Sequence, residues 1–82
     1  MTTHTLHTTP AGLTITARPG LGGQWLVDFV KWGKTTKQLD RCAAWLPTGC
    51  WDERRWSPIS SRLVPAAAVL EVERWLREQG AA

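Results

Sequence analysis

The sequence predicts a small two-layer α+β domain, in which an antiparallel sheet of three to four strands packs against two helices in the order βββα(β)α. Three observations predict this class. Polar and apolar residues alternate in the first part of the chain, apolar residues recur at helical spacing in two later segments, and prolines and glycines separate these segments. The length of 82 residues is that of a single domain, 1–82.

The N-terminal part of the chain predicts a three-stranded antiparallel meander. Residues 3–9 are rich in threonine, which favours strands, and residues 10–12 form a turn. Alternating apolar residues then indicate two further strands, 13–18 and 24–30, on either side of a glycine-rich turn at 19–23. Each strand would bury one face and leave the other polar.

The spacing over residues 35–46 predicts the first helix. Thr35 and Gln38 stand at the spacing of a capping box, whose side chains satisfy amide groups in the first turn. Pro47 and Gly49 follow, and both residue types end helices. The apolar positions that recur at helical spacing and should pack on the sheet are Leu39, Cys42, Ala43 and Leu46.

Residues 50–63 fit neither the strand period nor the helix period, and two alternatives stay open. Residues 50–56 form a fourth, edge strand followed by a loop, or a short helix begins after Asp52. We favour the edge strand.

The last predicted element is a helix that begins at Pro65 and ends at Gly80. Proline suits the first turn because its missing amide is not needed there, and glycine is a common C-terminal cap. Its apolar stripe consists of Ala68, Val69, Val72, Trp75 and Leu76.

The most unusual feature of the composition is its six tryptophans, beside one phenylalanine and no tyrosine. Each indole offers about 150–250 Å² of surface to bury. A domain with a radius of gyration of roughly 12 Å can enclose about three of them. The others should lie at the surface, where tryptophan anchors protein partners or stacks on unpaired bases. The composition therefore predicts a binding module.

The positive charge is concentrated in the middle of the chain. The formal net charge is +3, but residues 31–62 hold seven lysines and arginines against three carboxylates, together with four of the six tryptophans. Basic side chains beside aromatic ones are typical of a nucleic-acid-binding surface and equally of a surface that binds an acidic protein.

Two groups of residues in this region are the candidate binding sites. The first surrounds the start of the predicted first helix, which favours anions, and consists of Lys31, Trp32, Lys34, Lys37 and Arg41. The second consists of Trp51, Arg54, Arg55 and Trp56. The alternatives are that the first group is an ordinary solvated cationic face and that Trp51 or Trp56 is a third core indole.

The sequence predicts neither a metal site nor a catalytic site. His4 and His7 lie three apart in a predicted strand, so their rings should point to opposite faces and cannot share a metal. The cysteines form no C-x-x-C motif, and no serine lies in a G-x-S-x-G elbow. We therefore expect no metal, no cofactor and no enzymatic activity.

The chain is expected to be cytoplasmic. It has no apolar run as long as the roughly 18 residues of a membrane span, and it does not start with a basic segment followed by an apolar stretch. Two cysteines are too few for a disulfide-rich secreted scaffold. We interpret Cys42 and Cys50 as reduced thiols and Cys42 as a small buried residue.

One segment carries a resemblance to a known family. The stretch Thr36-Lys37-Gln38-Leu39-Asp40, followed by Leu46-Pro47, resembles a segment of small type I-F anti-CRISPR proteins of phages and mobile elements. The resemblance covers about a dozen of the 82 residues. It implies a protein that binds a CRISPR surveillance complex or nuclease without catalysis of its own. The basic charge of this chain argues against DNA mimicry and for docking on an acidic or RNA-bearing surface.

The expected function is therefore that of a small non-enzymatic inhibitor or adaptor that binds a protein or nucleoprotein complex, of which a CRISPR effector is the class that the resemblance implies. The alternative is a small regulatory protein that binds nucleic acid directly through its basic, tryptophan-containing surface. A third interpretation is a minor enzyme subunit or assembly factor. No membrane partner is expected, and the sequence leaves the oligomeric state open.

Overall fold

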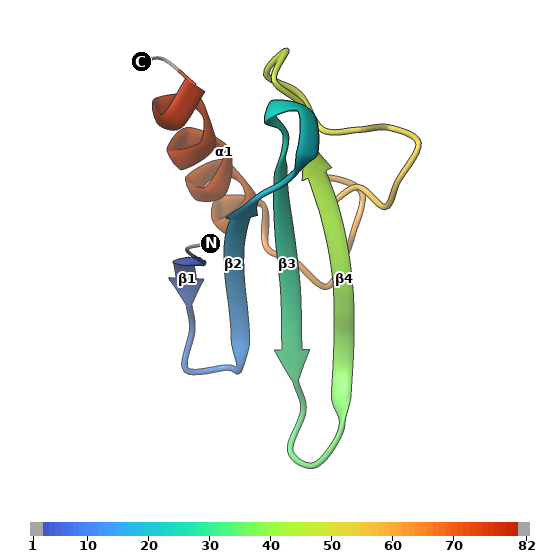
Figure 1. The fold of residues 1–82 in the computed structure, drawn as a ribbon. Helices are drawn as coiled ribbons and strands as arrows, with labels where there is room; N and C mark the ends of the chain where they lie inside the picture. The colour runs from blue at the N-terminus through green and yellow to red at the C-terminus, as the bar shows by residue number, and fades with distance from the viewer. Residues whose placement is uncertain (1–2, 81–82) are drawn as a thin grey trace.

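In the described part of the chain, a four-stranded antiparallel sheet is joined by one C-terminal α-helix (Figure 1). The computed structural model describes residues 3–80. Neighbouring strands in the sheet are also neighbours in sequence, in the order β1-β2-β3-β4. The elements are β1 (His4–Thr8), β2 (Leu13–Pro19), a short 3₁₀ turn (Leu21–Gly23), β3 (Trp25–Trp32), β4 (Lys37–Trp45) and α1 (Ala66–Gly80). The α+β class and the antiparallel sheet are confirmed, but residues 3–80 contain one α-helix rather than two.

One face of the sheet is covered and the other is open. Ile15 of β2 pairs with Phe29 of β3, and Val27 pairs with Ala43 of β4, so their side chains point to the same face. All four are fully buried there. The opposite face carries Thr16, Asp28 and Cys42, and no helix of the described residues packs on it. The domain therefore has two layers.

The predicted first helix over 35–46 is wrong, because most of this segment forms β4. The four-residue turn 33–36 closes the β3–β4 hairpin, with the Gly33 amide donating to the Thr36 carbonyl at 2.7 Å. Thr35 and Gln38 therefore cap no helix. An isolated helix of this length is marginal, whereas a strand satisfies the outer hydrogen-bonding groups of β3. Tertiary pairing overrides the local helical spacing.

The segment after β4 is largely irregular, so the predicted edge strand 50–56 is wrong in extent. It is reduced to one isolated bridge, in which Trp51 pairs with Trp45. The Asp52 amide donates to the Ala44 carbonyl at 2.9 Å, and the chain then leaves the sheet. The alternative short helix after Asp52 does not form either. The fourth strand of the sheet is β4.

The predicted C-terminal helix is confirmed as α1, which begins directly after Pro65. The Pro65 carbonyl accepts hydrogen bonds from the Ala68 and Val69 amides at 3.0 and 3.2 Å. The predicted stripe faces the sheet, with Trp75 half-buried and the other members buried, namely Ala68, Val69, Val72 and Leu76.

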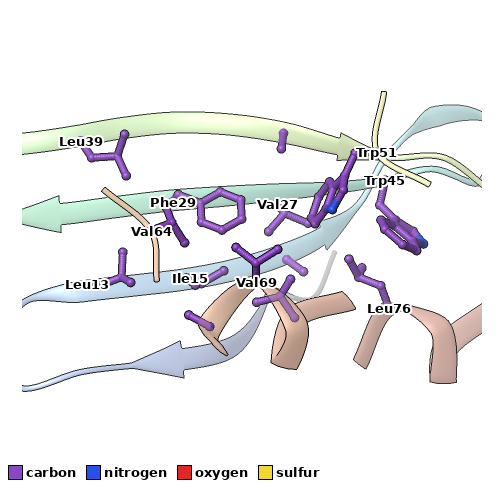
Figure 2. Packing of buried hydrophobic residues seen from close by; sticks show 14 residues of the cluster. Leu13, Ile15, Val27, Phe29, Leu39, Trp45, Trp51, Val64, Val69 and Leu76 are labelled. Atoms are coloured by element: carbon purple, nitrogen blue, oxygen red, sulfur yellow. The ribbon is translucent and has the colours of Figure 1, made fainter. Parts of the chain in front are cut away.

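The hydrophobic core lies between the sheet and α1, and aromatic rings close one end of it (Figure 2). The rings of Trp45 and Trp51 meet edge to face with centroids 5.0 Å apart. The indole nitrogen of Trp51 donates to the buried carboxylate of Glu73 at 2.8 Å. This bond joins the irregular segment to α1 and satisfies a polar group that would otherwise be costly to bury.

Candidate binding surface

The six tryptophans divide into two that are buried, three that are half-buried and one that is exposed. Trp45 and Trp51 are buried in the core. The half-buried indoles pack against the core and are Trp25, Trp56 and Trp75. Trp32 is 52% exposed. The interior therefore does not enclose all six rings, and Trp32 is the indole that solvent reaches most freely.

Trp32 is the last residue of β3 and lies at the base of the β3–β4 turn, which projects beyond the β1–β2 end of the sheet (Figure 1). It pairs in register with Lys37, the first residue of β4. The Lys37 ammonium lies 5.2 Å from the centroid of the Trp32 ring, within the range of a cation–π contact. It also pairs with the Asp40 carboxylate at 3.0 Å. The indole and this cation thus form one unit at the end of the sheet.

The turn between β1 and β2 holds the Trp32 backbone in place. The Trp32 amide donates to the Gly12 carbonyl at 3.2 Å. Gly12 has a φ of +94°, and a Cβ atom there would lie 2.8 Å from the Trp32 carbonyl oxygen. Only glycine combines this backbone conformation with so close an approach. A fixed backbone therefore presents the exposed indole.

Lys31 and Lys34 lie beside Trp32. Together with Pro10 and Gly12 they line a shallow hollow of about 430 Å³ between the two turns. We call Lys31, Trp32, Lys34 and Lys37 the hairpin-tip surface. No helix begins there, so the positive charge of this surface comes from the lysines alone, and the helix N-terminus that the sequence suggested is absent from it.

Arg41, the remaining member of the first predicted group, lies apart from the hairpin-tip surface. It stands in the middle of β4, opposite Phe29, so its side chain is on the face of the sheet that α1 covers. It is exposed because it lies at the edge of that face, near Trp56.

The second predicted group is not brought together as one surface. Trp51 is in the core, and Trp56 packs edge to face on Phe29 with ring centroids 5.3 Å apart. Arg54 and Arg55 are exposed, and their guanidinium nitrogens lie 3.5 and 4.0 Å from the Asp52 carboxylate. This pairing lowers the net charge that the two arginines present. The alternative interpretation, that Trp51 or Trp56 belongs to the core, fits both residues: Trp51 is buried in the core and Trp56 packs against it.

The prediction that His4 and His7 point to opposite faces is wrong, because β1 has a bulge between Thr5 and His7. Both side chains contact α1. The His4 ring lies 5.3 Å from the Trp75 ring, and His7 Nδ1 lies 3.0 Å from the Glu71 carboxylate. Across residues 3–80, no three histidine, cysteine, aspartate or glutamate side chains are grouped so that they could hold a metal ion.

The sequence suggested that Cys42 is a buried core residue. In the structure it is half-buried and lies on the open face of the sheet, opposite Asp28. Asp28 is itself paired with Arg18. Partial burial raises the pKa of the Cys42 thiol, and the neighbouring Asp28 carboxylate raises it further. Cys50 is exposed. The two thiols therefore differ in their access to solvent.

Comparison with protein-family models, with curated proteins and with solved structures finds no match for this chain. None of the helices in the described part of the chain has the length and apolar character needed to cross a membrane.

Proposed function

We propose that this chain is a small non-enzymatic binding protein, of the inhibitor or adaptor type, that docks on a protein or nucleoprotein complex through the hairpin-tip surface. The observation that carries the proposal is Trp32, which is 52% exposed, lies 5.2 Å from the Lys37 ammonium and lines a hollow together with Lys31 and Lys34. Tryptophan is favoured at binding hot spots, and cations on a surface orient an acidic partner and accelerate its association.

The resemblance of residues 36–40 and 46–47 to type I-F anti-CRISPR proteins supports a CRISPR effector as the partner class and a phage or mobile element as the source. Such a partner would place the protein in the cytoplasm. Residues 36–40 span the end of the hairpin turn and the start of β4, next to Trp32.

Affinity capture from the native host tests this proposal. The wild-type protein, the Trp32→Ala variant and a Leu21→Ala control would each be used with and without nuclease. Leu21 is also an exposed apolar residue, but it lies in the 3₁₀ turn outside the hairpin-tip surface. We expect a nuclease-resistant protein partner that Trp32→Ala loses and Leu21→Ala retains. Equal capture by both variants would rule out the hairpin tip as the docking surface.

Direct binding of single-stranded nucleic acid is the second candidate, and the same indole favours it. An exposed ring with the Lys37 ammonium 5.2 Å away, next to a hollow that Lys31 and Lys34 line, offers a stacking platform and positive charge for the backbone. This function predicts quenching of Trp32 fluorescence by an oligonucleotide and an affinity that falls steeply with salt. Absence of quenching by DNA and RNA at low salt would eliminate it.

A further inference from the structure

The two edges of the sheet differ in how far they are protected. β1 is short and bulged, and both features discourage pairing with another strand. β4 has nine residues, and only its C-terminal end is covered. There the Asp52 amide donates to Ala44 at 2.9 Å, and the Leu46 amide donates to Cys50 at 2.8 Å. In Figure 1 the chain returns beside the end of β4 where the arrowhead lies.

Along a strand, the amide and carbonyl groups of successive residues point alternately toward one neighbouring strand and away from it. This alternation shows which groups of β4 point outward, away from β3. The Ala44 carbonyl points away from β3, because it accepts from Asp52. Residues two and four positions earlier, Cys42 and Asp40, must then direct their amide and carbonyl groups to the same side. The pairing of β3 with β4 is regular from Leu39 to Trp45. Nothing in residues 3–80 hydrogen-bonds these outward groups.

A groove runs along this edge on the face that α1 covers. It has a volume of about 370 Å³ and lies between residues 37–41 of β4 and the segment 56–63. Its apolar lining comes from Leu39, Trp56 and Leu63, of which Leu63 is 42% exposed. Its cations are Lys37 and Arg41. A strand added to β4 would place every second side chain in this groove.

The charges of the groove indicate what kind of strand fits. Lys37 is paired with Asp40, whereas Arg41 has no carboxylate within 4.0 Å among the described residues. A second, antiparallel copy of β4 that used the outward groups of both Asp40 and Cys42 would be centred on Arg41. It would set two Arg41 side chains opposite each other, which is destabilising. The charge pattern therefore favours a foreign strand with an acidic residue opposite Arg41.

We propose that the outer edge of β4 pairs with an extended segment of a partner protein, which adds to the sheet as a fifth strand. The segment carries an acidic side chain opposite Arg41 and an apolar side chain opposite Leu39, beside Leu63. Backbone bonds to Asp40 and Cys42 provide affinity, and the two side chains provide specificity. The inference rests on the proposed function only in requiring a protein partner, and it uses a surface other than the hairpin tip.

Titration with synthetic peptides, followed by the backbone amide signals in NMR spectra, tests the inference. The probe is a capped peptide in which glutamate and valine alternate at every second position, with threonine between them, so that a glutamate can face Arg41 while a valine faces Leu39. Its controls are a lysine–valine peptide and a glutamate–valine peptide that is N-methylated at alternate residues. We expect the Asp40 and Cys42 amides to shift and to exchange at least tenfold more slowly with the glutamate peptide. Both control peptides should bind at least tenfold more weakly, because one reverses the charge and the other removes backbone donors.

Two variants separate backbone pairing from simple charge attraction. Cys42→Pro removes an outward donor that the ladder does not use, and Cys42→Ala is its matched control. Only the proline variant should lose at least tenfold in affinity. Because proline can also disturb folding, Arg41→Glu provides a second test. It should reject the glutamate peptide and bind the lysine peptide.

Three outcomes would overturn the inference. These are no shift at Asp40 and Cys42 at millimolar peptide, equal binding of the N-methylated peptide, and shifts of the same amides that depend on protein concentration without any peptide. The last would show self-association instead. Trp32→Ala should leave peptide binding unchanged. A negative peptide titration would therefore not contradict binding through the hairpin-tip surface. Unchanged capture by Trp32→Ala would likewise not contradict strand pairing at the β4 edge.

Discussion

The indole nitrogen of Trp51 donates a 2.8 Å hydrogen bond to the carboxylate of Glu73, which is 8% exposed. The two residues come from the irregular segment after β4 and from the middle of α1. This contact fixes the segment across the end of the core, where Trp51 also meets Trp45 edge to face. The segment between β4 and α1 has no helix or strand, and this hydrogen bond holds it in one position against the core.

Replacement of Trp51 by phenylalanine should destabilise the fold. The substitution keeps an aromatic ring but removes the donor, so the buried Glu73 carboxylate loses its partner. We expect a loss of about 1–3 kcal/mol in the free energy of unfolding, measured by urea denaturation. Glu71→Gln, at an exposed position two residues before Glu73, is the control and should change stability by less than about 1 kcal/mol. Equal losses in the two variants would contradict the role of the Trp51–Glu73 bond.

Replacement of Gly12 by alanine should destabilise the protein more than replacement of Gly22. Both glycines have positive φ, at +94° and +70°. A Cβ at Gly12 would lie 2.8 Å from the Trp32 carbonyl oxygen, whereas a Cβ at Gly22 meets nothing within 4 Å. Gly22→Ala therefore carries only the conformational cost of about 1–2 kcal/mol. Thermal or urea unfolding of the pair measures the difference, and a larger loss for Gly22→Ala would refute the close approach.

Collisional quenching of fluorescence should act mainly on Trp32. It is the most exposed of the six indoles, because the other five are buried or half-buried. Trp32→Phe should therefore remove most of the emission that acrylamide quenches readily and should leave the free energy of unfolding within about 1 kcal/mol of wild type. Trp51→Phe provides the comparison. The assignment fails if Trp32→Phe leaves the readily quenched fraction unchanged.

Cys50 should react with iodoacetamide before Cys42 does. The thiolate is the reactive form, and the raised pKa of Cys42 lowers its thiolate fraction at any given pH below that pKa. Peptide mass spectrometry after short exposure at neutral pH should find Cys50 modified and Cys42 largely unmodified. Raising the pH should accelerate the reaction of Cys42.

The Asp28→Asn variant tests the cause of this difference. Removal of the carboxylate should lower the pKa of Cys42 and accelerate its alkylation at neutral pH. Unchanged alkylation of Cys42 in this variant would show that burial alone sets its reactivity.

The sequence determined the parts of this fold whose pattern is local and unambiguous. The alternation around Ile15 and Phe29 specifies strands with one buried face. The stripe that includes Val72 and Leu76 specifies α1. The excess of indoles over the capacity of the core and the basic middle of the chain also followed from composition, and they predicted a tryptophan at the surface.

The remaining features depend on contacts between segments that are distant in sequence, so no local pattern could predict them. The apolar residues of 37–45 recur at helical spacing, but pairing with β3 selects the strand. The bulge in β1 brings His4 and His7 to the same face, and no spacing rule could have shown it. Burial of Trp51 against Glu73, with Trp32 left exposed, depends on where α1 docks. Composition gives the number of indoles, but the packing of α1 and the irregular segment on the sheet determines which one a partner can reach.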